Sequence, residues 1–370
     1  MHRNAAPGRI RALHAGLARF LAAGLTALVF LLALSVLEGW TADKIPFAPG
    51  DTLEQIREKI RLNGYNFTVS DAWISSLSPQ QRANLHTRGK LPSRGTAAAM
   101  DASTLALDSP VALPASFDWR NVGGRAYLGP VRDQKDCGSC YAFAAAAMAE
   151  GAYNIANGRY NANCADFSEQ YIAFCLGTYG PYVNSFDGCF GANYDYDELL
   201  ALTQVGIIPE ARMPYTWTDP GGCTYGDYAP RIKFASWGRV GCNDIDAIKA
   251  AIMTYGPVDA AVWVENNGPF ANYSGGVFED TLTSCTGNPT CAYQTTNHAI
   301  TLVGWDDAGD AQNNGYWILR NSWGTNWGEQ GYMRIKYTSA RVGCSVAYLV
   351  MPPSGGRFSV PGISKQLLLQ

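Results

Sequence analysis

Histidines and charged side chains are scarce in this sequence. Only four of its 370 residues are histidines, and three of them lie before residue 111. Acid–base chemistry by an imidazole in residues 111–370 therefore depends on His298 alone. Charged residues make up 16% of the chain and hydrophobic residues 47%, a balance that is typical of a globular protein and excludes a disordered one.

Positive charge is lacking in the longer, C-terminal part of the chain. Residues 1–110 hold 12 lysines and arginines against 8 acidic residues, whereas residues 111–370 hold 16 against 23. An acidic main region argues against nucleic-acid binding as its function. The basic leader has the charge needed to bind and cover the acidic region of the same chain. The alternative is that this uneven distribution of charge has no function.

Cysteine is absent from the first 136 residues. All ten cysteines lie between residues 137 and 344, and this density predicts an oxidising compartment. Cys137 and Cys140 form one C-x-x-C pair, but no second pair follows and the flanking sequence is not a βαβ pattern. A zinc site or a redox pair is therefore disfavoured, and we expect neither a metal nor a cofactor.

A long hydrophobic run is found at Phe20–Leu37, and the 19 residues before it contain four arginines and no acidic residue. A basic segment followed by a hydrophobic one is typical of an export signal. A run of 18 residues is at the edge of what spans a bilayer. We expect a cleaved signal within residues 1–42, with an N-terminal anchor formed by residues 20–37 as the alternative. In both cases the chain is exported, and is secreted or periplasmic.

Residues 43–112 are predicted to be a pro-segment and linker. Asp51–Leu62 begins with a capping residue and repeats apolar side chains at helical spacing, which predicts an amphipathic helix. Ser78–Leu85 has proline in its first turn and predicts a second, short helix. Residues 93–110 are rich in Ala, Ser, Thr and Asp and are expected to be an easily cut linker. Residues 351–370 are expected to be a loosely held tail.

Residues 113–350 are predicted to form one α+β domain of two lobes. Helices are expected at residues 139–156, 167–175 and 197–205. Short β-like runs follow at residues 258–264, 276–278, 299–304, 316–321 and 331–337. Helices first and strands later are typical of an α+β protein.

The stretch Gln134-Lys-Asp-Cys-Gly-Ser-Cys-Tyr141 carries the strongest chemical signal. It places Cys140 in the first turn of a predicted helix, at the positive end of the helix dipole and beside unpaired backbone N–H groups. That setting lowers the pKa of a thiol and favours the nucleophilic thiolate. Without the flanking motif, an inert core cysteine would be the default interpretation.

His298 and Asn321 stand at the ends of two predicted strands and can complete a catalytic set with Cys140. A thiolate that attacks a carbonyl carbon needs an adjacent imidazolium, which stabilises it and then protonates the leaving amine. An amide side chain fixes the orientation of the ring. Gln134 lies six residues before Cys140, so its amide can point at the carbonyl together with the backbone N–H of Cys140.

Residues 113–350 resemble the papain (cathepsin-like) family of cysteine peptidases. The resemblance runs in order through Phe117-Asp-Trp-Arg120, Gln134, Cys137-Gly-Ser-Cys140, Ser168-Glu-Gln170, Asn297-His-Ala299 and Asn321-Ser-Trp-Gly-Thr-Asn-Trp-Gly328. It implies these roles: nucleophile Cys140, acid/base His298, orienter Asn321 and oxyanion donor Gln134, with Trp323 shielding the His298–Asn321 hydrogen bond from water.

The family fold has a helical left lobe that carries the cysteine and a β-barrel right lobe that carries the histidine. A protein or peptide substrate lies extended in the cleft between them. The resemblance further implies a monomeric zymogen whose pro-segment is a possible intramolecular inhibitor. By position, the expected substrate-binding residues are Gly191, Ala192, Ala261, Thr296, Asn297 and Trp323. Ala261 and Thr296, together with Leu349, are small or apolar and favour an apolar side chain two residues before the cut.

The resemblance also implies three disulfide bonds, namely Cys137–Cys189, Cys175–Cys223 and Cys291–Cys344. Each would close a sizeable loop, worth about 2–4 kcal/mol against unfolding. Cys164, Cys242 and Cys285 remain, and because three is odd, at least one of them is free or pairs between molecules.

Several positions depart from the family pattern. Tyr141 replaces the usual tryptophan. Ala192 replaces a glycine, which narrows the substrate wall if its φ is negative and strains the backbone if its φ is positive. Residues 306–315 are an insertion that we expect to be a solvated loop, with a calcium site as the alternative. The pro-segment lacks the long helical signature of the family inhibitors, and no twin-histidine occluding insertion is present, which favours an endopeptidase.

Two other functions stay open at this point. One is a catalytically silent relative that binds peptides or a partner in the same cleft; the presence of Cys140, His298 and Asn321 argues against it. The other is a thiol-dependent acyl- or amide-transferase, which is disfavoured because the sequence gives no general sign of an acceptor site.

Overall fold

A computed structural model describes residues 43–85, 103–104, 113–178, 185–192, 196–223, 231–285, 296–307 and 315–353. The predicted export signal, most of the predicted linker, most of the 306–315 insertion and most of the tail lie outside the described residues. Within the described part of the chain, no helix has the length and apolar character needed to cross a membrane. Residues from Ile45 onward belong to one compact unit.

The first predicted helix of the pro-segment is confirmed as α2 (Leu53–Asn63). Its N-cap is Thr52, whose side chain forms a capping box with Gln55. The sequence predicted Asp51 as the capping residue. Its carboxylate instead accepts a hydrogen bond from Lys59 at 2.6 Å. The capping box fixes the first turn of α2. The ion pair ties Lys59, in the second turn, to Asp51, which precedes the helix.

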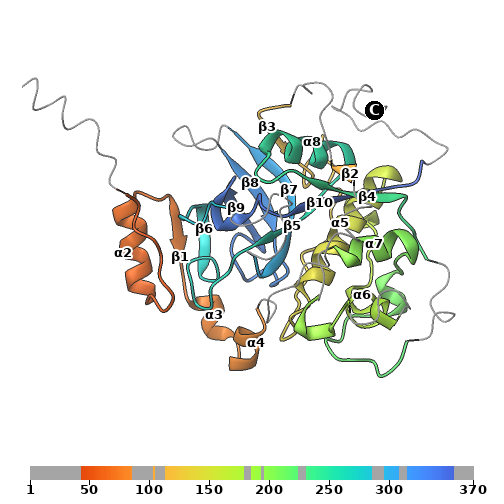
Figure 1. The fold of residues 1–370 in the computed structure, drawn as a ribbon, viewed down its shortest axis with the longest axis horizontal. Coiled ribbons are helices and arrows are strands. Elements are labelled where there is room, and N and C mark those ends of the chain that lie inside the picture. The colour runs from red at the N-terminus through yellow and green to blue at the C-terminus, as the bar shows by residue number, and fades with distance from the viewer. Residues whose placement is uncertain are drawn as a thin grey trace, which may run out of the picture. The chain divides into compact units, whose positions relative to one another are not determined.

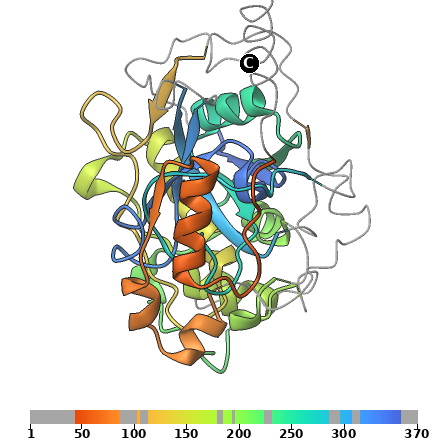
Figure 2. The same ribbon diagram turned by 90° about the vertical axis from the view of Figure 1, so that its left-hand side faces the viewer.

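The second predicted helix is confirmed as α4 (Pro79–Ala83), with Ser78 as its N-cap. Between the two helices lie a short strand, β1 (Phe67–Val69), and a five-residue helix, α3 (Ala72–Ser76). β1 pairs in antiparallel fashion with a strand of the main sheet, Phe67 opposite Gly276. In Figure 2, α2 lies in front of that sheet. The pro-segment is therefore joined to the main domain through backbone hydrogen bonds.

Three helices form the left lobe: α5 (Cys140–Ala156), α6 (Glu169–Phe174) and α7 (Asp197–Gln204). All three correspond to predicted helices. α5 is rich in alanine, the best helix former, and it is apolar on nearly every side, so it is buried along almost its whole length. Ser168 caps α6 by accepting a hydrogen bond from the backbone of Tyr171 at 3.0 Å.

The right lobe is built on a sheet of ten described strands, nine of them in the order β1-β6-β9-β8-β7-β5-β10-β4-β2, with β3 paired to β7. Their bounds are β2 (Ser103–Thr104), β3 (Ser116–Asp118), β4 (Ser236–Val240), β5 (Val258–Val262), β6 (Tyr273–Phe278), β7 (His298–Asp306), β8 (Tyr316–Arg320), β9 (Tyr332–Lys336) and β10 (Val346–Val350). One further helix, α8 (Ile245–Tyr255), packs against β7 and β10. Short 3₁₀ turns lie at Asn161–Asn163, Leu176–Thr178, Gly188–Phe190, Glu210–Arg212 and Ser339–Arg341.

Two hydrophobic cores correspond to the two lobes. One lies within the sheet and includes the fully buried Trp119, Trp305 and Trp317. The other surrounds α5, α6 and α7, and it also takes in residues of β5, β7 and β10. Figure 1 shows the helices α5, α6 and α7 together on one side of the strands. The structure is therefore the predicted α+β arrangement of two lobes, with α5 packed where they meet.

A tight contact of α5 with the second lobe requires a glycine. A Cβ atom on Gly151 would lie 2.4 Å from Cδ of Pro257, which is too short for any side chain. Pro257 directly precedes β5, so a side chain at position 151 would clash with the residue that leads into the sheet.

Two of the three expected disulfides are present, Cys137–Cys189 and Cys175–Cys223. The third expectation, Cys291–Cys344, is wrong, because Cys344 pairs with Cys285 at a Cα–Cα distance of 5.3 Å. This distance is within the range that a disulfide requires. Cys291 lies outside the described residues.

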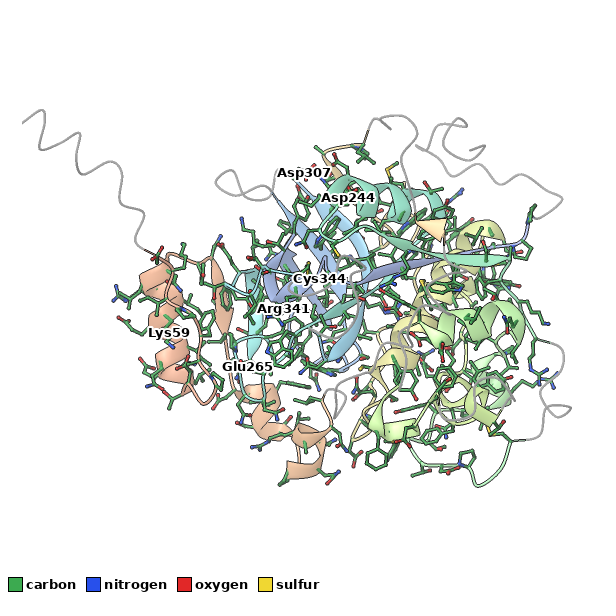
Figure 3. All side chains as sticks on the ribbon, viewed as in Figure 1. Lys59, Asp244, Glu265, Asp307, Arg341 and Cys344 are labelled. Carbon is green, nitrogen blue, oxygen red and sulfur yellow. A yellow bond between two sulfur atoms is a disulfide. The ribbon has the colours of Figure 1, made fainter. Side chains whose placement is uncertain are left out.

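Spacing along the chain could not separate Cys285 from Cys291, which are six residues apart in one connection between β6 and β7. Cys344 lies beside Arg341, which accepts its backbone hydrogen bond (Figure 3). Cys242 is also disulfide-bonded. Among the cysteines that the structure describes, Cys140 and Cys164 are free. Cys164, one of the three cysteines that the sequence left unassigned, therefore has no disulfide partner.

Candidate active site

Cys140 is the first residue of α5, as the sequence predicted. Its N-cap, Ser139, makes no side-chain capping bond; its hydroxyl contacts the hydroxyl of Tyr215 at 2.8 Å. The next residue, Tyr141, donates a hydrogen bond to the backbone oxygen of Gly188 at 3.0 Å. The substituted tyrosine therefore ties the first turn of α5 to the loop that carries Cys189.

The thiol of Cys140 is enclosed, with 1% of the residue exposed. Burial raises the pKa of the Cys140 thiol to about 12; the backbone N–H groups of Ala299 and Tyr141 lower it, and the charge of Asp259 raises it. The sequence predicted a lowered pKa, and that prediction is wrong for this enclosed thiol because loss of water outweighs the nearby N–H groups. Ionisation therefore needs a positive partner or a more open cleft.

His298 begins β7, and its neighbour Ala299 donates a backbone hydrogen bond to Sγ of Cys140 at 3.5 Å. The two lobes thus bring the first residue of α5 and the first residue of β7 together. Nε2 of His298 lies 2.8 Å from Oδ1 of Asn321. Trp323 stacks on the imidazole with ring centroids 4.7 Å apart. This indole covers the ring that Asn321 orients, as the predicted shield would.

Gln134 is fully buried beside the same loop. Its Oε1 accepts a hydrogen bond from the hydroxyl of Ser322 at 2.7 Å, which fixes the orientation of the amide. Its Nε2 donates to the backbone oxygens of Cys137 at 3.0 Å and of Asn84 at 3.3 Å. The amide that was predicted to bind a substrate carbonyl therefore binds a carbonyl of the pro-segment. Sequence reasoning missed Ser322, although it directly follows Asn321.

The pro-segment also contacts Trp323. The indole Nε1 donates to the backbone oxygen of Leu85 at 3.2 Å, and Trp73 stacks on the ring with centroids 5.1 Å apart. Asn84 adds a side-chain hydrogen bond to the backbone oxygen of Asp136 at 2.6 Å. Residues 73–85 thus cover the predicted oxyanion donor and the predicted shield of the histidine together.

The residues predicted to line the cleft lie on both lobes. Gly191 has φ 110° and ψ −172°, a conformation that favours glycine. The φ of the described neighbour Ala192 is not positive, so its side chain causes no backbone strain. Ala261 and Leu349 belong to the same buried cluster as Cys140. These side chains are small or apolar.

Asn297 and Thr296 lie just before β7. The amide of Asn297 accepts from the backbone N–H of Val264 and donates to its oxygen, each at 2.8 Å. This pair of bonds holds the start of β7 against the end of β5. Thr296 is buried. Among the described residues, no group of three or more His, Cys, Asp or Glu side chains is placed to hold a metal ion.

A buried charged cluster, which sequence reasoning missed, lies beneath the site between α5, α6 and β8. It consists of Glu150, Glu169 and Arg320, each at most 4% exposed, with Arg132 beside them. Burial raises the pKa of Glu150 to about 7, although the charge of Arg320 and a hydrogen bond from the backbone of Phe167 lower it. Burial likewise raises the pKa of Glu169. The signal for this cluster in the sequence was Glu150, a charged residue within the mostly apolar α5.

A family model described as papain family cysteine protease matches residues 113–353. A cathepsin L-like proteinase of Fasciola hepatica is 33% identical over 247 residues, which are 67% of this chain and 67% of that protein.

Solved structures agree with these sequence matches. The proform of the ragweed pollen allergen Amb a 11, a cysteine protease, is 26% identical with a TM-score of 0.51, over 66% of this chain and 68% of that one. Digestive procathepsin L 3 of Tenebrio molitor is 22% identical with a TM-score of 0.61, over 81% of this chain and 88% of that one, and shows the same fold.

The buried position of Glu150 predicts a pH-dependent stability. A carboxyl whose pKa is raised on folding stabilises the fold below its unfolded pKa and loses that contribution as pH rises through about 7. In an inactive Cys140→Ala chain, Glu150→Gln should gain on the order of 2 kcal/mol relative to its parent between pH 5 and pH 8. Urea unfolding at the two pH values measures this difference.

Glu58→Gln is the matched control, because Glu58 is an exposed carboxylate of the pro-segment whose pKa is lowered by Arg61. It should show no comparable gain. A Glu150→Gln chain that loses stability relative to its parent as pH rises would contradict the assignment.

Proposed function

Because this chain belongs to the papain family of cysteine proteases, we propose that Cys140, His298, Asn321 and Gln134 are its catalytic residues. The chain is a cysteine peptidase that is made as a zymogen. The observation that carries the residue assignment is the meeting of α5 and β7. It places the Cys140 sulfur against the residue after His298, whose ring is held by Asn321. The comparisons give no support to a catalytically silent relative.

In the proposed reaction the Cys140 thiol gives its proton to His298, and the thiolate attacks the carbonyl carbon of the scissile bond. The amide of Gln134 and the backbone N–H of Cys140 stabilise the negative oxygen that forms. His298 then protonates the leaving amine, and a water molecule hydrolyses the acyl-enzyme. Asn321 holds the imidazole throughout, so that one ring nitrogen always faces the sulfur.

The pro-segment acts as an intramolecular inhibitor by occupying groups that the reaction needs. The backbone oxygen of Asn84 takes the Gln134 amide, and that of Leu85 takes the indole N–H of Trp323. Pairing of β1 with β6 anchors the segment outside the cleft. A pro-segment without the long helical signature of the family inhibitors can thus suffice, because backbone carbonyls and one stacked tryptophan make the contacts.

Substrates are proteins or peptides, and we assign endopeptidase activity because the sequence contains no twin-histidine occluding insertion. Ala261 and Leu349 favour an apolar side chain two residues before the cut. Gly191 and Ala192 would offer backbone groups to the substrate. A peptide-library profile dominated by Arg or Glu at that position would contradict this preference.

The disulfide bonds fit an exported protein. We further propose an export signal in residues 1–42, a pro-segment and linker in 43–112, and a peptidase domain in 113–350. The product would be a secreted or periplasmic monomer with no nucleic-acid partner, and membrane attachment would come only from residues 20–37.

Autocatalytic processing tests the assignment of the nucleophile. Wild-type protein is expected to cut itself within residues 93–113 on incubation, whereas Cys140→Ala should stay intact and lose peptidase activity by at least about 10³-fold. Mass spectrometry of the purified proteins gives both the new N-terminus and its dependence on the thiol.

Cys164→Ala serves as the matched control, because Cys164 is the other free cysteine among the described residues. It should be processed like the wild type. Processing of the Cys140→Ala chain at the same site and rate would overturn the assignment.

Release of the pro-segment tests its inhibitory contacts. Trp73→Ala removes the stack on Trp323, which is worth about 0.5–1.5 kcal/mol, so the unprocessed chain should expose Cys140 more often. Alkylation of Cys140 by iodoacetamide should be roughly 2- to 10-fold faster than in the wild type. Leu62→Ala, at an exposed leucine of α2, should leave the rate unchanged. Equal rates for all three chains would contradict the proposed contacts.

A further inference from the structure

Two large aromatic side chains are exposed next to the loop that ends at Cys140. Phe190 is 63% exposed and Trp217 is 43% exposed. Among the described residues, the other exposed large hydrophobic side chains are Ile45 and Leu62, which both lie in the pro-segment. Exposed aromatic rings offer a large apolar area to a ligand, and tryptophan is enriched at binding interfaces.

Both aromatic residues lie against the Cys137–Cys189 disulfide. Phe190 directly follows Cys189, and Sγ of Cys189 is 3.5 Å from the backbone oxygen of Trp217. The backbone N–H of Gly138 donates to the oxygen of Cys189 at 2.9 Å. Both residues therefore lie at the disulfide that joins the loop of Cys189 to the segment that ends at the nucleophile. We refer to Phe190 and Trp217 as the aromatic rim.

Trp217 is held in a strained backbone conformation. Its φ is 51°, in the left-handed region that costs a bulky residue roughly 1–2 kcal/mol. Gln170 clamps the backbone on both sides, accepting from the N–H of Thr216 at 3.0 Å and donating to the oxygen of Thr218 at 2.6 Å. Gln170 itself is 1% exposed. Strain of this kind persists where the surrounding structure imposes it, and it is frequent at ligand-binding sites.

The loop is further anchored to the catalytic segment by Tyr215. Its hydroxyl donates to the backbone oxygen of Gln134 at 2.9 Å and contacts the hydroxyl of Ser139 at 2.8 Å. The rings of Tyr215 and Trp217 are 6.4 Å apart. The exposed indole is thus fixed relative to the oxyanion donor itself and to the residue before the nucleophile.

An extended substrate would direct one particular side chain toward this rim. Successive side chains of an extended peptide point to opposite sides. If the second residue before the cut points at Ala261 and Leu349, on strands of the sheet, the residue directly before the cut points the other way. That direction is toward the disulfide wall of the left lobe, where Phe190 is exposed.

We propose that the aromatic rim of Phe190 and Trp217 makes this peptidase selective for an apolar or aromatic side chain directly before the scissile bond. The proposal rests on the proposed peptidase function and adds a second point of selectivity to it. Burial of the substrate side chain against two rings that are already exposed and fixed supplies the preference, with little conformational cost to the enzyme.

A matched pair of peptides tests the proposal with the processed enzyme. The peptides share leucine two residues before the cut and differ only in having phenylalanine or glycine directly before it. The wild type should show a higher kcat/KM for the phenylalanine peptide. Phe190→Ala and Trp217→Gly should each reduce the ratio of the two values by about 3- to 10-fold. The kcat/KM for the glycine peptide should stay within about twofold of wild type.

The choice of variants keeps the test decisive. Trp217→Gly suits the φ of that position and so removes the indole without backbone strain. Phe190→Leu keeps an apolar side chain and should retain most of the preference, even if Phe190→Ala fails to fold. If the ratio of the two kcat/KM values stays unchanged in the variants while the glycine peptide is still cleaved, the proposed role of the aromatic rim is wrong. The proposed peptidase function would be unaffected by that result.

Absence of cleavage of either peptide by the wild type would instead count against the proposed function itself. A third peptide, with arginine directly before the cut, distinguishes the chemical class. If the wild type prefers arginine over phenylalanine and Trp217→Gly loses this preference, the apolar assignment is wrong. The indole of Trp217 would then bind a cation over its face.

Discussion

The site depends on one meeting point, where the first turn of α5 touches the first residues of β7. There the Ala299 N–H reaches the sulfur of Cys140, and one residue earlier the ring of His298 is held by Asn321. Neither lobe contains the whole set. The packing of an alanine-rich helix against the sheet, with Gly151 lying against Pro257, brings together the two segments that carry the proposed nucleophile and the proposed base.

The same groups explain how the chain stays inactive. A buried thiol is neutral, because its pKa is raised by the loss of water, and the Gln134 amide is occupied by a backbone carbonyl of the pro-segment. Trp323 serves both states, since it covers His298 on one side and binds Leu85 and Trp73 on the other. In the proposed mechanism, inhibition and catalysis therefore depend on the same residues, and removal of the pro-segment frees the groups that the reaction would use.

Local patterns in the sequence were enough to predict α5, α6, α7, the strand that begins at His298 and the strand that ends just before Asn321. α8 was missed, although Asp244 caps it and apolar residues recur at helical spacing. What depends on tertiary contact could not be predicted: the choice of Cys285 over Cys291 as the partner of Cys344, the strand order, and the burial of the charged cluster. The prediction of a lowered pKa for Cys140 was wrong for the same reason. The helix terminus can be recognised in the sequence, but the loss of water around the thiol cannot.

The most direct test of this account is the pH dependence of Cys140 alkylation in the processed enzyme, wild type against His298→Ala, with both brought to the same N-terminus by added wild-type enzyme. If an imidazolium holds the thiolate, the wild type should react with iodoacetamide at pH 6 at least about 10²-fold faster than the variant. The variant should become reactive only as pH rises above the ordinary thiol pKa of about 8.5. Identical pH profiles for the two proteins would show that Cys140 and His298 do not form an ion pair, and the proposed mechanism would fail.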